Sequence, residues 1–123
     1  MSESLHPPLP PAELATLTLA LRELLAALPS EQPLPTYHEA ARALGLKPPH
    51  TVYRVIQALE QTMREDAAAG RPLLAARVVS RVRDRLPAPG FFDLATRLGL
   101  HDGAESGPAA RAFHRAQLQA LSR

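Results

Sequence analysis

Residues 36–70 constrain the fold most, because their sequence marks two helices and the turn between them. Thr36 is followed three residues later by Glu39, which is the spacing of a capping box, where each side chain satisfies an orphan backbone N–H at a helix start. Gly45 suits the left-handed position that closes a helix, and the Pro-Pro pair after it denies backbone donors and fixes φ. A first helix is therefore predicted from Thr36, ending at a turn over residues 45–50.

A second, longer helix is predicted from about His50 or Thr51. Its apolar residues recur at helical spacing, at Val52, Val55, Ile56, Leu59 and Met63. The order of Ala41, Gly45 and then Thr-Val-Tyr-Arg-Val-Ile is typical of a helix-turn-helix, whose second helix offers its N-terminal polar residues to a DNA major groove. The alternative is a helical hairpin that serves only as scaffold.

A leucine-rich segment precedes this pair. Six leucines recur at intervals of mostly three and four residues, at Leu14, Leu17, Leu21, Leu24, Leu25 and Leu28, which predicts a helix over residues 12–28 with one strongly apolar face. We prefer packing of that face inside the protein, and pairing with a second copy of the chain is the alternative. Residues 1–11 contain four prolines and are predicted to be a disordered lead.

Basic residues concentrate after the helix pair. Residues 71–85 carry five arginines against one aspartate, in a chain whose net charge is only +2. The part from Arg81 to Arg85 is closed by a Pro-Ala-Pro-Gly turn and is predicted to be a wing-like loop that reaches the phosphate backbone or the minor groove. A solvated surface loop is the alternative interpretation.

The rest of the chain gives weaker signals. Residues 73–80 alternate as a strand does, yet apolar residues also repeat there every four positions, and the Val78-Val79 pair favours a short strand or extended segment. A short helix is predicted over residues 91–98 with Phe92, Leu94, Ala95 and Leu98 inward, and residues 101–107 read as a linker. A last helix is predicted over residues 108–123, with Ala109, Ala112, Phe113, Ala116 and Ala120 on its apolar side and Arg111, His114 and Arg115 on the other.

Composition excludes several classes of chemistry. The chain has 123 residues, enough for one domain, and no cysteine, so disulfides, thiolate zinc sites and a cysteine nucleophile are impossible. Its five histidines are scattered, without metal-ligand spacing or a catalytic constellation, so we expect no enzyme, metal or cofactor. No apolar run could cross a membrane and no secretory signal is present, which makes a cytoplasmic protein the expectation.

A family resemblance covers about half the chain. The elements Thr36-Tyr37, Ala40-Ala41, Gly45, the long helix, Arg77-Val78-Val79 and the Pro/Gly turn at residues 87–92 occur in one order. In that order the chain resembles the C-terminal DNA-binding domain of the alkylguanine-DNA alkyltransferases and alkyltransferase-like proteins. The resemblance implies a winged helix-turn-helix fold.

The same resemblance implies roles for individual residues. Tyr37 matches the family's tyrosine that assists phosphate rotation during base flipping, which gives a base-flipping hypothesis. Tyr53, with Arg54 beside it, stands where the family has the arginine that fills the gap left by the flipped base. Ala75 or Ala76 stands near the place of the reactive cysteine, so the resemblance implies no alkyl transfer.

The sequence thus predicts a mainly α, winged-helix-like domain over residues 12–100 with at most a short β element, packed by N- and C-terminal helices. We expect a non-enzymatic protein that binds double-stranded DNA, as a regulator or a DNA-handling accessory. The expected contact residues are Tyr37, Lys47, His50, Thr51, Tyr53, Arg54, Gln57, Arg71, Arg77, Arg81, Arg83 and Arg85. The alternative function is a protein-interaction adaptor that uses the leucine-rich helix or the basic loop. A homodimer could form through the leucine-rich helix or the C-terminal helix.

Overall fold

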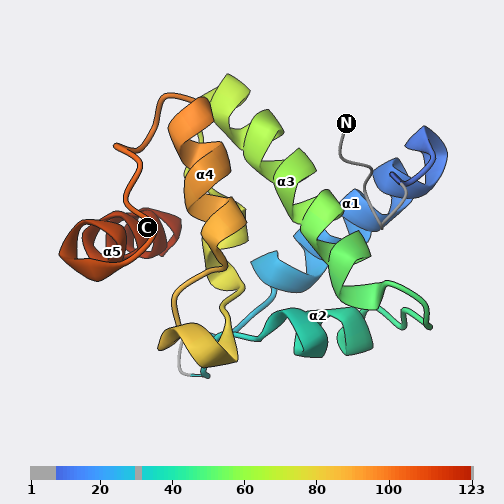
Figure 1. The fold of residues 1–123 in the computed structure, drawn as a ribbon. Coiled ribbons are helices and arrows are strands. Elements are labelled where there is room, and N and C mark those ends of the chain that lie inside the picture. The colour runs from blue at the N-terminus through green and yellow to red at the C-terminus, as the bar shows by residue number, and fades with distance from the viewer. Residues whose placement is uncertain (1–7, 30–31, 123) are drawn as a thin grey trace, which may run out of the picture.

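Helix α3 (Thr51–Ala69) is the element on which the others pack, and α1, α2 and α4 all contact it (Figure 1). The computed structural model describes residues 8–29 and 32–122, so most of the predicted lead, residues 1–7, lies outside the described residues. The other elements are α1 Pro11–Ala26, α2 Tyr37–Ala43, the 3-10 helices η1 Leu74–Arg77 and η2 Arg81–Arg83, α4 Pro89–Arg97 and α5 Gly107–Leu121. The predicted mainly α fold is confirmed.

The two central helices begin where their capping signals predict. The Thr36 hydroxyl accepts from the Glu39 backbone N–H at 3.2 Å, while a Glu39 carboxylate oxygen accepts from the Thr36 N–H at 2.9 Å. Gly45 has φ +72° and closes α2, and α3 begins at Thr51 after a cis Pro48–Pro49 bond. Both helix starts and the turn of the predicted helix-turn-helix are therefore present.

The leucine face of α1 packs inside the protein. Leu21 and Leu25 are fully buried in the core, and Leu17, Leu24 and Leu28 are partly buried against it. The face is thus largely used for intramolecular packing, as preferred from the sequence. No described helix combines the length and the hydropathy that crossing a membrane requires.

The ambiguous segment at residues 73–80 is part helix and part extended. η1 forms a single turn, after which Val78 and Ser80 have extended φ and ψ. Val79 donates its N–H to the Pro35 carbonyl at 3.0 Å and makes one isolated parallel bridge with Thr36. Within residues 8–29 and 32–122 no strand forms beyond this bridge, which ties the start of α2 to the chain beyond η1.

The predicted inward face of the last helix is right for Phe113, which packs against the core, but wrong for most of its alanines. Ala109, Ala112 and Ala116 are exposed, whereas Ala110 and His114 are buried. His114 is only 7% exposed, and its Nε2 donates to the Ala76 carbonyl at 2.8 Å. The alanines did not identify the inward side because small residues fit on either side of a helix. Burial of His114 could not be predicted because the hydrogen bond that satisfies its ring comes from a distant element.

The predicted linker at residues 101–107 is also part of the packing. Its His101 ring lies 4.5 Å from the Phe113 ring and 5.5 Å from the Phe92 ring, measured between centroids. Phe91, which was not among the residues predicted to face inward, is buried with Phe92, and the rings of both lie near Phe113 of α5. The chain between α4 and α5 therefore carries an aromatic contact that joins the two helices.

Candidate nucleic-acid interface

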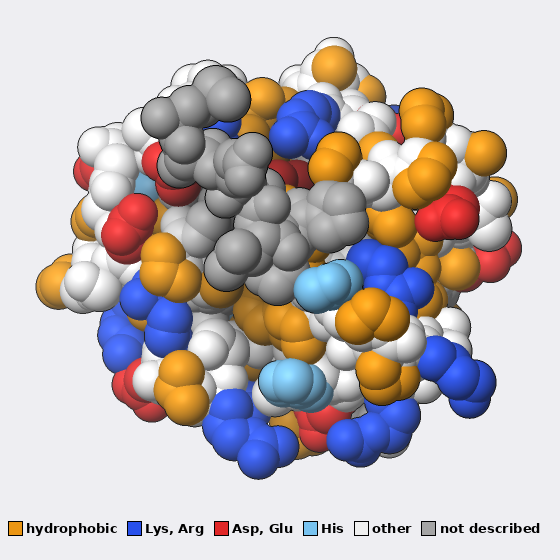
Figure 2. All heavy atoms as spheres, turned by 45° about the vertical axis from the view of Figure 1, so that its right-hand side comes forward, with side chains coloured by type: hydrophobic (Ala, Val, Ile, Leu, Met, Phe, Trp, Pro, Cys, Tyr) orange, Lys and Arg blue, Asp and Glu red, His pale blue; other side chains and the backbone are white. Residues whose placement is uncertain are grey.

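A groove of about 500 Å³ runs between α2, the first turn of α3 and the segment from Val79 to Val82. It is lined by Thr36, Tyr37, His38, Arg42, Val52, Val79, Ser80, Arg81 and Val82. Figure 2 shows Lys and Arg side chains gathered along the lower edge of one face, at the height of α2 in Figure 1, with acidic side chains between some of them. The groove therefore combines apolar walls with exposed cations.

The burial pattern of α2 explains why two of its polar side chains face the groove. Ala40 and Ala41 are buried against the core, so His38 and Arg42, four residues apart, lie on the outer side. Neither residue was among the predicted contacts. Their spacing on the polar side of a short capped helix was the signal that could have identified them.

One carboxylate moderates this positive charge. The hydrogen bond from the Thr36 backbone N–H holds the pKa of Glu39 below its ordinary value, and the neighbouring charges of Arg81 and Arg42 lower it further. Glu39 is exposed and stays ionised near neutral pH. The groove is thus cationic through two arginines, with one capping carboxylate beside them.

The predicted recognition residues divide between two sides of the helix pair. Lys47 and His50 are exposed on the turn, and Thr51 begins α3 at half-buried exposure. Arg54 instead folds back, and its Nη2 donates to the carbonyls of Lys47 and of Pro49, the latter at 3.0 Å. The guanidinium of Arg54 therefore holds the turn together.

Gln57 and Tyr53 lie farther along α3 and are half-buried. The Gln57 side-chain oxygen accepts the Leu9 backbone N–H at 2.8 Å, so it contacts the segment that precedes α1. The N-terminal segment thus borders the side of α3 on which the sequence predicts base contacts.

Tyr37 is committed to the interior. It is 9% exposed, and its hydroxyl accepts the Ala88 backbone N–H at 2.8 Å, next to the start of α4. Burial raises the pKa of the phenol above its ordinary value. The hydroxyl to which the resemblance assigns phosphate rotation is used here as an acceptor that joins α2 to α4.

Four of the five predicted phosphate-binding arginines bond to protein groups. Arg71 pairs with Asp66 at 3.0 Å, and Arg77 donates to the carbonyls of Leu25 and Leu121. Arg83 donates to the carbonyls of Pro87 and Glu105, and Arg85 donates to that of Leu34 at 2.6 Å. The fifth, Arg81, is exposed and lines the groove.

Comparison of the chain with protein-family models, with curated proteins and with solved structures gives no match. The resemblance to the alkyltransferases therefore stays an expectation. Ala75 and Ala76, near which that family carries its cysteine, are buried on η1. In the described part of the chain, no group of three or more His, Asp or Glu side chains could hold a metal ion.

Proposed function

We propose that this protein is a non-enzymatic binder of double-stranded DNA, which it contacts through the groove beside the helix pair. The observation that carries the proposal is the convergence of Arg42 and Arg81 from two elements far apart in sequence onto one groove at the start of α3. Planar guanidinium groups contact phosphates well, and two of them lining one groove offer two donors to a phosphate backbone.

The start of α3 supports the same proposal. Its first turn carries no acidic residue, so the partial positive charge of the helix N-terminus is not offset there. Lys47 and His50 are exposed on the turn that leads into it. In the proposed complex this end of α3 enters the major groove, and the turn residues contact the flanking phosphates.

Hydrogen bonds and ion pairs within the protein limit the number of arginines that are proposed to contact phosphates. Arg71, Arg77, Arg83 and Arg85 have protein acceptors. The proposed phosphate contacts are therefore Lys47, Arg42 and Arg81, which are all exposed. About three contacts predict a slope near −3 when log affinity is plotted against log salt concentration. That slope is shallower than phosphate contacts from all seven Lys and Arg side chains among the predicted contact residues would give.

The test is binding to random duplex DNA across a salt series, for wild type and for the double variant Arg42→Gln with Arg81→Gln. Losing two phosphate contacts is expected to reduce the slope by about 2 and to weaken binding at low salt. Arg64→Gln with Arg97→Gln is the matched control, because these arginines are also exposed and pair with Glu60 and Asp93 on their own helices, away from the groove. Equal slopes for both double variants would reject the groove as the DNA site.

Regulation of transcription and DNA handling both fit a duplex binder of this kind, and a cytoplasmic location belongs to the same proposal. The base-flipping hypothesis stays open as a test, since 2-aminopurine fluorescence in a bound duplex reports any unstacked base.

The adaptor alternative depends on a different surface. Leu19 is 63% exposed on α1, beside a groove of about 470 Å³ that Pro11, Leu14 and Ala15 also line. An exposed leucine next to an apolar groove is typical of a protein contact, including one with a second copy of the chain. If micromolar protein does not shift duplex DNA at low salt, the adaptor is the better proposal.

A further inference from the structure

Val82 is the most exposed large apolar residue that the structure describes. Its exposed fraction is 89%, against 63% for Leu19 and 42% for Leu100. It lies in η2, at the tip of the loop at residues 80–86. A β-branched apolar side chain held almost entirely in water gains from any apolar partner that covers it.

The loop that carries Val82 has a defined internal geometry. Its ends meet where the Ser80 N–H donates to the Leu86 carbonyl at 2.8 Å, and the Leu86 N–H donates to the Arg83 carbonyl at 3.1 Å. Asp84 and Arg85 both adopt positive φ, of 54° and 62°, which turns the chain back toward the core. The tip is thus a closed turn.

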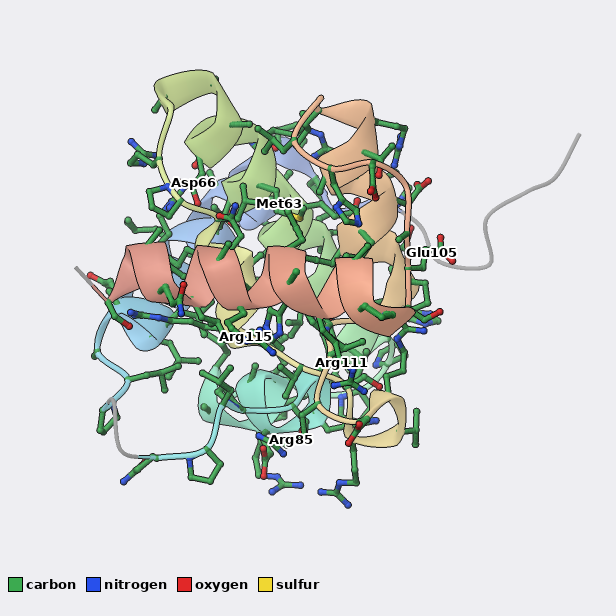
Figure 3. All side chains as sticks on the ribbon, turned by 90° about the vertical axis from the view of Figure 1, so that its left-hand side faces the viewer. Met63, Asp66, Arg85, Glu105, Arg111 and Arg115 are labelled. Atoms are coloured by element: carbon green, nitrogen blue, oxygen red, sulfur yellow. The ribbon has the colours of Figure 1, made fainter. Side chains whose placement is uncertain are left out.

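Three side chains fasten this loop to its surroundings. Arg83 bonds to the Pro87 carbonyl at 3.1 Å and to the Glu105 carbonyl, and Arg85 bonds to the Leu34 carbonyl at 2.6 Å. Asp84 pairs with Arg111 of α5 at 2.6 Å. Figure 3 shows Arg111 projecting from the edge of α5, with Arg85 below that helix. Because the loop is already ordered, a ligand that covers Val82 pays little to immobilise it.

The chemistry around the tip identifies the kind of partner. Val82 and Arg81 lie on one wall of the groove, with His38 and Arg42 on α2 opposite. An apolar point flanked by the guanidinium groups of Arg81 and Arg42 complements a DNA minor groove, where phosphates border a floor of sugars and base edges. A purely apolar protein surface would instead leave the neighbouring guanidinium groups poorly solvated.

We propose that Val82 is an apolar wedge that enters the minor groove of the bound duplex and partly unstacks one base step, while Arg81 contacts the adjacent phosphate. This inference rests on the proposed DNA binding and deepens it. Since unstacking is easiest at pyrimidine–purine steps, the wedge predicts a preference for duplexes that contain TpA steps over A-tracts of equal length.

The experiment compares wild type with Val82→Thr, which keeps the β-branched shape and replaces a methyl group by a hydroxyl. Leu19→Thr is the matched control at another exposed apolar residue. Affinity is measured at three salt concentrations on TpA-containing and A-tract duplexes, and fluorescence is measured with 2-aminopurine beside the TpA step. Because Val82 is almost fully exposed, neither fold nor stability should change.

The expected result is an affinity about fivefold lower for Val82→Thr at every salt concentration, because burial of an apolar group is lost while no charge is removed. The TpA preference and the fluorescence increase should both shrink, and Leu19→Thr should behave as wild type. Equal affinity and equal TpA preference for Val82→Thr would overturn the wedge and leave DNA binding intact. A change in sedimentation mass instead of DNA affinity would assign the tip to self-association and overturn it too. If wild type binds no duplex at low salt, the proposed function itself fails.

Discussion

Substitution of Arg77 distinguishes most clearly between two roles for the basic residues, a contact with DNA and a structural role within the protein. Its Nη1 donates to the Leu25 carbonyl at 2.9 Å and its Nη2 to the Leu121 carbonyl at 3.2 Å, near the C-terminal ends of α1 and α5. Helix C-termini expose carbonyls with no partner in the helix, and a cation there also interacts favourably with the helix dipole. One guanidinium thus joins the last turns of two helices.

Replacing Arg77 by methionine keeps much of the aliphatic stem and removes both hydrogen bonds. Hydrogen bonds to charged groups contribute about 1.5–3 kcal/mol each, and partial exposure of Arg77 reduces the sum, so we expect a loss of about 2–3 kcal/mol in the free energy of unfolding. For a chain of this length, that corresponds to a fall of about 10 °C in the unfolding midpoint. Affinity for duplex DNA, measured well below that midpoint, should be unchanged.

The measurement is thermal unfolding by circular dichroism together with duplex binding at 15 °C. Arg81→Met is the control, since Arg81 is exposed on the groove and its loss should weaken DNA binding without lowering the midpoint. The reasoning is refuted if Arg77→Met unfolds at the wild-type temperature and binds DNA more weakly, because Arg77 would then be a phosphate contact.

Two further predictions concern buried ionisable groups. Asp66, 1% exposed, accepts from Arg71 and the Leu74 N–H and pairs with Arg22 at 3.0 Å, so Asp66→Ala should cost about 3–5 kcal/mol in urea unfolding. Asp66→Asn should cost less, and a loss below about 1 kcal/mol for the alanine variant would contradict the role of this carboxylate. Burial lowers the pKa of His114, so the unfolded chain binds the extra proton and stability should fall as the pH drops below about 6.5. His114→Gln should reduce that pH dependence in parallel unfolding curves, and identical dependence in both proteins would exclude His114 as its source.

The central helix pair was predictable because its signals are local. A capping box, a glycine in the left-handed conformation and a Pro-Pro pair act within a few residues of the chain, so the starts of α2 and α3 follow from the sequence. The leucine spacing of α1 was equally local, and Leu21 and Leu25 are indeed core residues. In each case the residues that decide the structure are neighbours in sequence.

The outer helices were harder to predict because distant elements decide their packing. The side of α5 that faces inward depends on the Ala76 carbonyl, 38 residues earlier, which accepts from His114. Phe91 is buried partly against Phe113 and His114, which both come from α5. A sequence pattern shows which side of a helix is apolar, but it does not show which polar group finds an acceptor elsewhere.

The predicted contacts of the arginines differ most from those in the structure, and this difference changes which residues are proposed to contact DNA. A cluster of like charges in the sequence favours a phosphate-binding surface, yet Arg77, Arg83 and Arg85 donate to backbone carbonyls of other segments, among them that of Glu105. Such carbonyls at helix ends and turns are abundant, and a guanidinium with five donors satisfies them well. The basic segment therefore acts first as a set of ties that fix a loop, and Arg81 and the exposed apolar Val82 are two of its residues that line the groove. In the proposed complex, we expect DNA affinity to depend less on the amount of charge than on where these hydrogen bonds hold the side chains of Arg81 and Val82. A variant that loosens the ties without touching Arg81 or Val82, such as Arg83→Gln, should therefore weaken binding while leaving the salt slope unchanged.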